Sequence, residues 1–179
     1  MIILTDTIKK IRLFGLVKDS IVDGVGIRTA IFTQGCPHFC KGCHNPKSHS
    51  TSNGELWEMA DVIKAFSDNP LLDGITLSGG EPFMQPAACA ILARKAHELN
   101  LNVWTYTGYT FENLIKLSKF DVHIKDLLAE TDVLVDGPFI MEKRSLELGF
   151  CGSTNQRLIN VPQSLLENQV VLYNPPLWE

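Results

Sequence analysis

Three cysteines lie within eight residues of the chain, in the segment CPHFCKGC. Cys36, Cys40 and Cys43 have the spacing Cys-x3-Cys-x2-Cys. Neighbours this close could hardly pair as disulfides without strain, so the spacing favours a metal site in a reducing compartment over a disulfide framework. Soft thiolate ligands select zinc, copper(I) or iron–sulfur clusters.

Two kinds of metal site fit the triplet. A structural zinc ion normally has four ligands, and His38, His44 and His49 are the candidates for the fourth. A four-iron cluster held by only three thiolates instead leaves one iron open, and an open iron can take a substrate as a chelating ligand. The cysteine spacing by itself leaves both sites open.

A second motif, SGGEP, ends a short apolar strand. Gly79 and Gly80 would let the backbone approach a ligand without a Cβ in the way, and Glu81 could accept a hydrogen bond from an ammonium group. An ordinary strand-to-helix turn would use the same residues. Thr107 follows the next predicted strand and could hold a sugar, although a turn in which Gly108 supplies an unusual backbone angle also explains TYTGYT.

Strands and helices alternate along the part of the chain that carries these motifs. The predicted strands are 26–33, 75–77, 102–106 and 132–135, and the predicted helices are 57–66, 86–98 and 110–117. This order favours βαβ units and a parallel sheet. There are too few units for a closed eight-stranded barrel. We therefore predict an α/β fold, an incomplete (β/α) barrel open on one side, with its binding groups at the carboxyl ends of the strands.

Length and composition limit the remaining possibilities. The chain has 179 residues, of which 45% are apolar, which predicts one domain over residues 1–179 with an irregular tail from about residue 161. The formal net charge of -4 gives no attraction to nucleic acid. No apolar run approaches the roughly 20 residues of a membrane span, and the N-terminus does not resemble a signal peptide. We expect a cytoplasmic protein.

Four further residues have simpler explanations. Cys89 falls in the middle of a predicted helix and is expected to be a small buried hydrophobe. Cys151 lies in a glycine-containing turn and is a candidate exposed thiol. Arg28 could pair with a cofactor carboxylate, but such an arginine more often closes a salt bridge. Asp136 is the one functional candidate in DVLVDGPF, a segment that plain core strand and turn also explain.

Taken together, the motifs resemble those of radical S-adenosylmethionine enzymes, in which the cysteine triplet is followed by a strand ending in SGGEP. The segments DGVGIR, QGCPHFCKGCHNP, ITLSGGEPF, VWTYTGYT, DVLVDGPF and GSTNQR, in this order, resemble the family of activating proteins of anaerobic ribonucleoside-triphosphate reductase. The likeness extends to about residue 160. Cys151 stands where that family tends to have an arginine.

The resemblance implies a mechanism. Cys36, Cys40 and Cys43 would hold a 4Fe-4S cluster whose open iron chelates S-adenosylmethionine. Reductive cleavage of the sulfonium bond would give a radical that removes a hydrogen from a glycine of the reductase, with no side chain acting as a separate catalytic group. The cofactor-binding residues would be Gly42, Cys43, His44, Gly79, Gly80, Glu81 and Thr107.

The same resemblance implies the partners. The reductase would be the protein substrate, and a flavodoxin or ferredoxin would be the electron donor. A small chain has little material to enclose its own site, so a bulky partner docked over it could exclude water. The alternatives are an activase of another glycyl-radical enzyme, such as pyruvate formate-lyase, or a non-catalytic zinc-binding interaction module.

Overall fold

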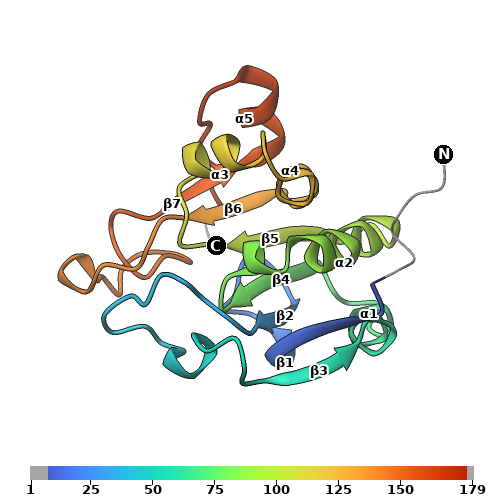
Figure 1. Cartoon of the computed structure of the whole chain (residues 1–179). Coiled ribbons are helices and arrows are strands. Elements are labelled where there is room, and N and C mark those ends of the chain that lie inside the picture. The colour runs from blue at the N-terminus through green and yellow to red at the C-terminus, as the bar shows by residue number, and fades with distance from the viewer. Residues whose placement is uncertain (1–7, 177–179) are drawn as a thin grey trace.

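The computed structural model of the protein describes residues 8–176, which form a seven-stranded sheet with helices packed on it (Figure 1). The strands occur in the sheet in the order β3-β1-β2-β4-β5-β6-β7. Their bounds are β1 Lys10–Ser20, β2 Arg28–Thr33, β3 Glu55–Glu58, β4 Gly74–Gly79, β5 Asn102–Tyr106, β6 Val133–Asp136 and β7 Arg157–Asn160. The helices are α1 Met59–Ser67, α2 Pro86–Glu98, α3 Phe111–Leu117, α4 Val122–Ala129 and α5 Val161–Glu167.

The middle of the sheet is parallel. Strands β2, β4, β5 and β6 run in the same direction, whereas β1 and β3 on one side and β7 on the other are antiparallel to their neighbours. Helices α1 and α2 lie in the connections that return the chain to the start of the next parallel strand. The prediction of parallel strands separated by helices is therefore confirmed for the centre of the sheet.

The outer strands differ from the predicted fold. The sheet is mixed and does not close, so the incomplete barrel of parallel strands is not confirmed. Strand β1 was missed because register shifts interrupt its pairing with β2, which weakens the alternation of apolar and polar residues. Strands β3 and β7 have four residues each, too few for a recognisable period.

The three predicted helices are present as α1, α2 and α3. Thr110 caps α3 as expected, because its side chain accepts a hydrogen bond from the Asn113 backbone N–H at 3.3 Å. Helix α2 packs against β4 and β5, with α1 and α4 beside it (Figure 1). Helix α4, which begins at an Asp121 cap, was not predicted.

The C-terminal part is more regular than expected. In place of an irregular tail from residue 161, the structure has α5, whose cap is Asn160 accepting from the Gln163 N–H at 3.1 Å. Val161 is fully buried, and the Ser164 hydroxyl accepts a hydrogen bond from Val171 N–H at 2.9 Å. A helix of seven residues has too few apolar positions to show a period. Residues 177–179 of the predicted tail lie outside the described part.

The two faces of the sheet have different roles. Strand residues such as Leu77 and Val103 face the helices and belong to the large apolar core. Their neighbours Trp104, Val133 and Val135 belong to a smaller, separate cluster on the other face of the sheet. The arrowheads of β4, β5 and β6 all point to the left in Figure 1, where the loops that follow β2 and β6 also lie. The carboxyl ends of the parallel strands therefore meet at one edge.

No helix within residues 8–176 is both long and apolar enough to cross a bilayer.

Candidate functional site

The cysteine loop follows β2 and is tied at its base by the backbone. The Gly35 N–H donates to the Ser48 carbonyl at 2.8 Å, and the Cys36 N–H donates to the His49 carbonyl at 3.1 Å. The buried Gln34 side chain adds hydrogen bonds to two further carbonyls of the returning segment. These contacts bring residues 35 and 49 together, so the intervening residues form a closed loop at the edge of the sheet.

The path of this loop requires unusual backbone angles. Gly35, Phe39 and Gly42 all have positive φ, and the Cys43 N–H donates to the Cys40 carbonyl at 3.1 Å in a tight turn. A Cβ at residue 42 would overlap the Met141 methyl group from the loop after β6. Glycine at this position therefore serves both the turn and the contact with that second loop.

All three cysteines reach the same pocket. Cys36, Cys40 and Cys43 are free thiols of intermediate exposure and line a cavity of about 410 Å³. Burial raises the pKa of Cys36 to about 11. Three soft donors on one wall fit an iron–sulfur cluster. Within the described part of the chain, no group of three or more His, Cys, Asp or Glu side chains has an arrangement that could hold a single metal ion.

The pocket also holds an unpaired nitrogen. The Nε2 atom of His49 is buried, has no hydrogen-bond partner among the described residues, and belongs to a side chain that lines the cavity. An orphaned polar atom in this position fits a polar group bound in the pocket.

Most of the predicted cofactor-binding residues surround this cavity. Cys43, His44, Gly79, Gly80 and Thr107 line it. Gly42 and Glu81 are not among the lining residues, although both adjoin residues that are. The structure therefore brings the cysteine triplet, the end of β4 and the end of β5 to a single pocket, as the motif order predicts.

Packing within the chain also explains the two glycines of SGGEP. Gly79 has a φ of +90°, and a Cβ there would lie 2.6 Å from the Cα of Phe32. A Cβ on Gly80 would overlap the Gly35 carbonyl oxygen. The Gly80 N–H donates to the Thr33 carbonyl at 2.8 Å. Close packing of β4 against the end of β2 thus requires glycine here whether or not a ligand is bound.

The Glu81 side chain is fully buried and is held by its own chain. One carboxylate oxygen accepts from the Phe83 N–H at 3.1 Å, and the other accepts from the Gly108 N–H at 2.9 Å. The Thr107 hydroxyl lies 3.0 Å from both oxygens, and His38 Nε2 lies 2.7 Å from the second. Glu81 therefore joins the end of β4, the end of β5 and the cysteine loop.

Some lining residues were not among the predicted cofactor-binding residues. Asp23, Tyr106 and Cys151 line the cavity, as does His38, which the sequence offered only as a possible zinc ligand. Burial raises the pKa of the Tyr106 phenol well above its ordinary value and raises the pKa of Cys151 to about 11. Each of these residues belongs to or adjoins a motif, such as DGVGIR or GSTNQR, so the motifs were the available signal.

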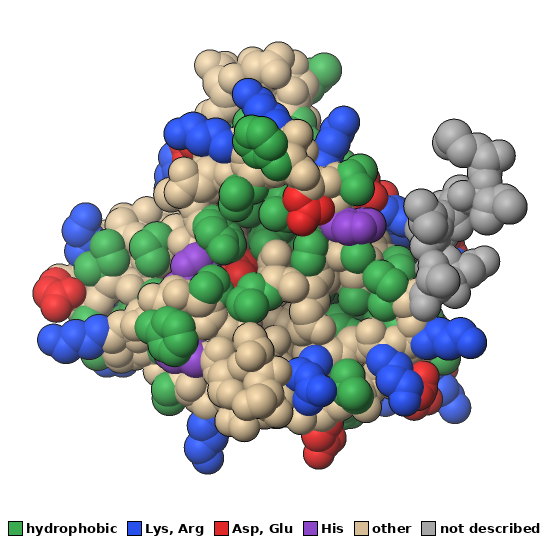
Figure 2. Space-filling view, in the orientation of Figure 1, with side chains coloured by type: hydrophobic (Ala, Val, Ile, Leu, Met, Phe, Trp, Pro, Cys, Tyr) green, Lys and Arg blue, Asp and Glu red, His purple; other side chains and the backbone are tan. Residues whose placement is uncertain are grey.

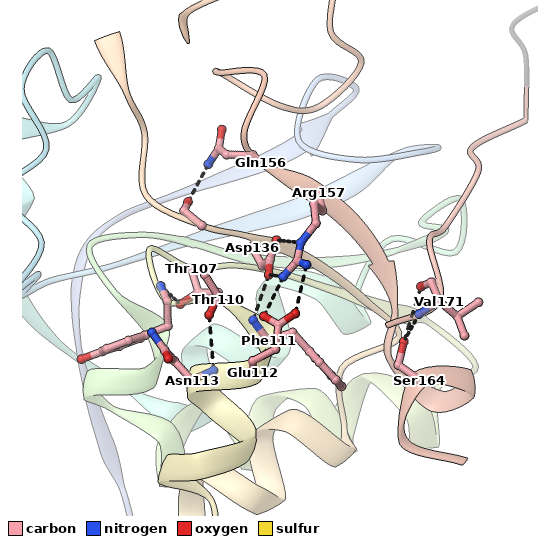
Figure 3. A network of polar contacts seen from close by, with 12 residues as sticks. Thr107, Thr110, Phe111, Glu112, Asn113, Asp136, Gln156, Arg157, Ser164 and Val171 are labelled. Atoms are coloured by element: carbon pink, nitrogen blue, oxygen red, sulfur yellow. Dashed lines mark hydrogen bonds and ion pairs between the residues drawn. The ribbon is translucent and has the colours of Figure 1, made fainter. Parts of the chain in front are cut away.

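The Asp136 carboxylate is paired with other residues of the chain and is not free (Figure 3). It is 1% exposed, accepts from the Phe111 N–H at 2.8 Å and pairs with Arg157, which also contacts Glu112 at 3.0 and 2.9 Å. The Arg157 guanidinium lowers the pKa of Glu112 to about 2. Gln156 beside it donates to the Gly137 carbonyl. This network connects β6, α3 and β7 next to the pocket.

Arg28 and Cys89 lie away from the pocket. Arg28 is fully buried, its guanidinium donates to Thr76 and Asn102, and burial lowers its pKa to about 10. Within residues 8–176 Arg28 forms no ion pair, so the expected salt bridge is not found. Cys89 has no exposed surface and packs in the large core, which confirms the prediction of a buried hydrophobe.

Comparison with known proteins supports an iron–sulfur site on this chain. A family model described as a 4Fe-4S single cluster domain matches residues 22–159. That range includes the cysteine loop and all strands from β2 to β6 together with most of β7. The chain therefore belongs to the class of iron–sulfur cluster proteins.

Characterised relatives identify the family more closely. The anaerobic ribonucleoside-triphosphate reductase-activating protein of Haemophilus influenzae is 36% identical over 147 residues, which cover 76% of this chain and 89% of the relative. The proteins of the same name from Vibrio cholerae and Enterobacteria phage T4 are 37% and 32% identical over 145 and 143 residues, covering 76% of this chain and 89% and 86% of theirs. The chain belongs to the family of anaerobic ribonucleoside-triphosphate reductase-activating proteins.

Proposed function

We propose that this protein uses a 4Fe-4S cluster on Cys36, Cys40 and Cys43 to cleave S-adenosylmethionine and to generate a glycyl radical on anaerobic ribonucleoside-triphosphate reductase. The observation that carries the proposal is that the three thiols share one pocket with the SGGEP strand end and the end of β5. The relatives' names supply the reductase as the target of that chemistry.

Three protein sulfurs would leave one iron of the cluster open for the cofactor's amino and carboxylate groups. A cluster held by Cys36, Cys40 and Cys43 would supply, when reduced, the electron needed to cleave S-adenosylmethionine to methionine and a 5'-deoxyadenosyl radical, and that radical would take a hydrogen atom from the glycine Cα. The chain's own part is to bind, orient and exclude water. Gly79, Gly80 and Thr107 would border the methionine and sugar, and Gly42, Cys43 and His44 the adenine.

The substrate is proposed to be a protein because the pocket is bounded by loops rather than by a second layer of structure. The loops that follow β1, β2 and β6 all contribute lining residues. Exposed hydrophobic side chains lie among charged ones on the left of Figure 2, where the loops after β2 and β6 lie in Figure 1. A docked partner would cover these loops and keep water from the radical. A flavodoxin or ferredoxin is the proposed electron donor.

Anaerobic reconstitution with iron and sulfide tests the proposal. After reduction, the protein should convert S-adenosylmethionine to 5'-deoxyadenosine and should produce a glycyl radical signal on the reductase by electron paramagnetic resonance. The Cys36→Ser variant should bind about tenfold less iron or worse, because losing a ligand exceeds the roughly 10–100-fold effect of losing an outer hydrogen bond. Cys89→Ala, which alters a core thiol, should retain the iron.

Two results would contradict the proposal. One is a colourless protein that binds zinc in place of iron and sulfide. The other is a well-formed cluster that yields no 5'-deoxyadenosine with any reductant. A radical formed on pyruvate formate-lyase but not on the reductase would support the proposed cleavage reaction and would show that the protein substrate is a different glycyl-radical enzyme.

A further inference from the structure

We propose that Glu81 is a positioning residue for the cysteine loop, acting through His38, and that its carboxylate is not the acceptor for the ammonium group of a bound cofactor. The inference deepens the proposed function, since it concerns how this chain prepares the cluster site. It departs from the direct cofactor contact that the SGGEP motif suggests.

The carboxylate has no free acceptor position. It receives four donors, namely the Phe83 and Gly108 N–H groups, the Thr107 hydroxyl and His38 Nε2, at distances between 2.7 and 3.1 Å. A carboxylate offers about four lone-pair sites. The Glu81 side chain is also 0% exposed and does not line the pocket. An ammonium group in the cavity would have to displace one of these donors to reach it.

His38 transmits the position of Glu81 to the cysteines. It lies between Cys36 and Cys40, and its Nε2 contacts the Glu81 carboxylate at 2.7 Å. A carboxylate only accepts, so Nε2 carries the hydrogen in this contact. The imidazole also packs edge-on against Tyr109 with ring centroids 4.6 Å apart. Its ring occupies the space that a side chain at Gly108 would fill.

The loop is thus held at two places. Its base is fixed by the backbone hydrogen bonds of Gly35 and Cys36, and His38, between the first two cysteines, is fixed to the strand ends by its contact with Glu81. Without the His38–Glu81 contact, the segment from Cys36 to Cys43 would keep its backbone hydrogen bonds at the base and its packing against the loop after β6, but it would lose its hydrogen bond to the strand ends. Glu81 would therefore limit the loop's freedom before any cluster is bound, which lowers the entropic cost of gathering three sulfurs.

Hydrogen exchange of the metal-free chain tests the inference directly. Glu81→Gln and His38→Phe should each raise the exchange of amides in residues 36–45 by about tenfold or more, because a charge-assisted hydrogen bond is lost. The Phe variant keeps a ring against Tyr109 and removes the donor to Glu81. Asp136→Asn is the matched control: it changes another buried carboxylate at a strand end, which has no hydrogen bond to the cysteine loop, and should leave this exchange unchanged.

The reconstituted protein supplies a second measurement. Both variants should alter the electron paramagnetic resonance spectrum and the midpoint potential of the reduced cluster when S-adenosylmethionine is absent. The double variant should behave like either single variant, because the two side chains form one contact. His38→Phe keeps the test valid if Glu81→Gln fails to fold.

The inference is overturned if Glu81→Gln leaves loop exchange and cluster spectra unchanged but weakens S-adenosylmethionine binding about tenfold, since that pattern belongs to a direct ligand. It is also overturned if His38→Phe has no effect on the loop. Absence of S-adenosylmethionine cleavage by the wild-type protein would refute the proposed function and leave the exchange result standing.

Discussion

At the scale of single residues, environment separates groups of the same chemical type. Cys36 reaches the pocket, whereas Cys89 lies in the apolar core, where burial raises its pKa far above the ordinary value. The carboxylates differ in the same way. Glu81 and Asp136 are buried and receive several donors, and Glu112 is half-exposed and paired with Arg157. Chemical type alone therefore does not define a role.

The pairing of Glu112 with Arg157 predicts a pH-dependent contribution to stability. The pKa of Glu112 is lowered to about 2, so the contribution is complete above the ordinary pKa of about 4.5 and is lost as the pH falls toward 2. Glu112→Gln should be less stable than wild type at pH 7, by no more than about 1 kcal/mol because the pair is half-exposed.

Urea unfolding at pH 7, 4 and 2.5 measures this effect. The difference in free energy of unfolding between wild type and Glu112→Gln should shrink steadily toward the lowest pH. A difference that stays constant down to pH 2.5 would show that the charge of Glu112 contributes nothing.

At the scale of elements, the site depends on how closely β4 approaches β2. The parallel register pairs Thr33 with Gly79, and the next residue, Gly80, lies against the Gly35 carbonyl. The cysteine loop and the SGGEP turn begin directly after these paired residues. Any separation of the two strand ends would therefore move both halves of the pocket.

Substituting Gly80 tests this close approach. Gly80→Ala adds a methyl group that overlaps the Gly35 carbonyl, and overpacking of this kind costs about 1–3 kcal/mol. For a chain of this size each kcal/mol lowers the melting temperature by roughly 2–4 °C. The control is Gly149→Ala, where an added Cβ meets nothing within 4 Å. Equal melting temperatures for the two variants would contradict the described packing.

At the scale of the whole molecule, the pocket opens between loops that come from distant parts of the chain. The loop after β6 contributes Phe139, Phe150 and Cys151 to the lining, and Leu146 in the same loop is 85% exposed. Phe120 is similarly exposed, at 90%. It follows the C-terminal end of α3, which is the end of that helix away from the pocket. The two residues allow a comparison of surfaces near and far from the pocket.

Docking of a protein substrate over the pocket predicts different results for these two positions. Leu146→Ser should lower the yield of glycyl radical on the reductase about tenfold, as loss of an apolar anchor at an interface does, and should leave cleavage of S-adenosylmethionine without the partner unchanged. Phe120→Ser should change neither rate. If Phe120→Ser has the larger effect, the partner docks elsewhere.

Much of the central architecture follows from the sequence. The apolar runs of β2, β4, β5 and β6 are recognisable because strands buried on both faces are nearly continuous in hydrophobic residues. The amphipathic helices between them show the 3.6-residue period. The outer strands β1, β3 and β7 could not be predicted in this way, because short or irregular strands are stabilised by pairing with neighbours that are distant in the sequence.

The sequence by itself determined the cysteine triplet, the strand-end glycines and the family, because ligand type and spacing are local properties of the chain. Only the tertiary structure decided which groups meet. It brought His38 and Gly108 to Glu81, and Cys151 to the pocket of the first three thiols, from positions far apart in the chain. The physical reason is that parallel strands align their carboxyl ends across crossovers, and a sequence does not reveal which loops will meet there.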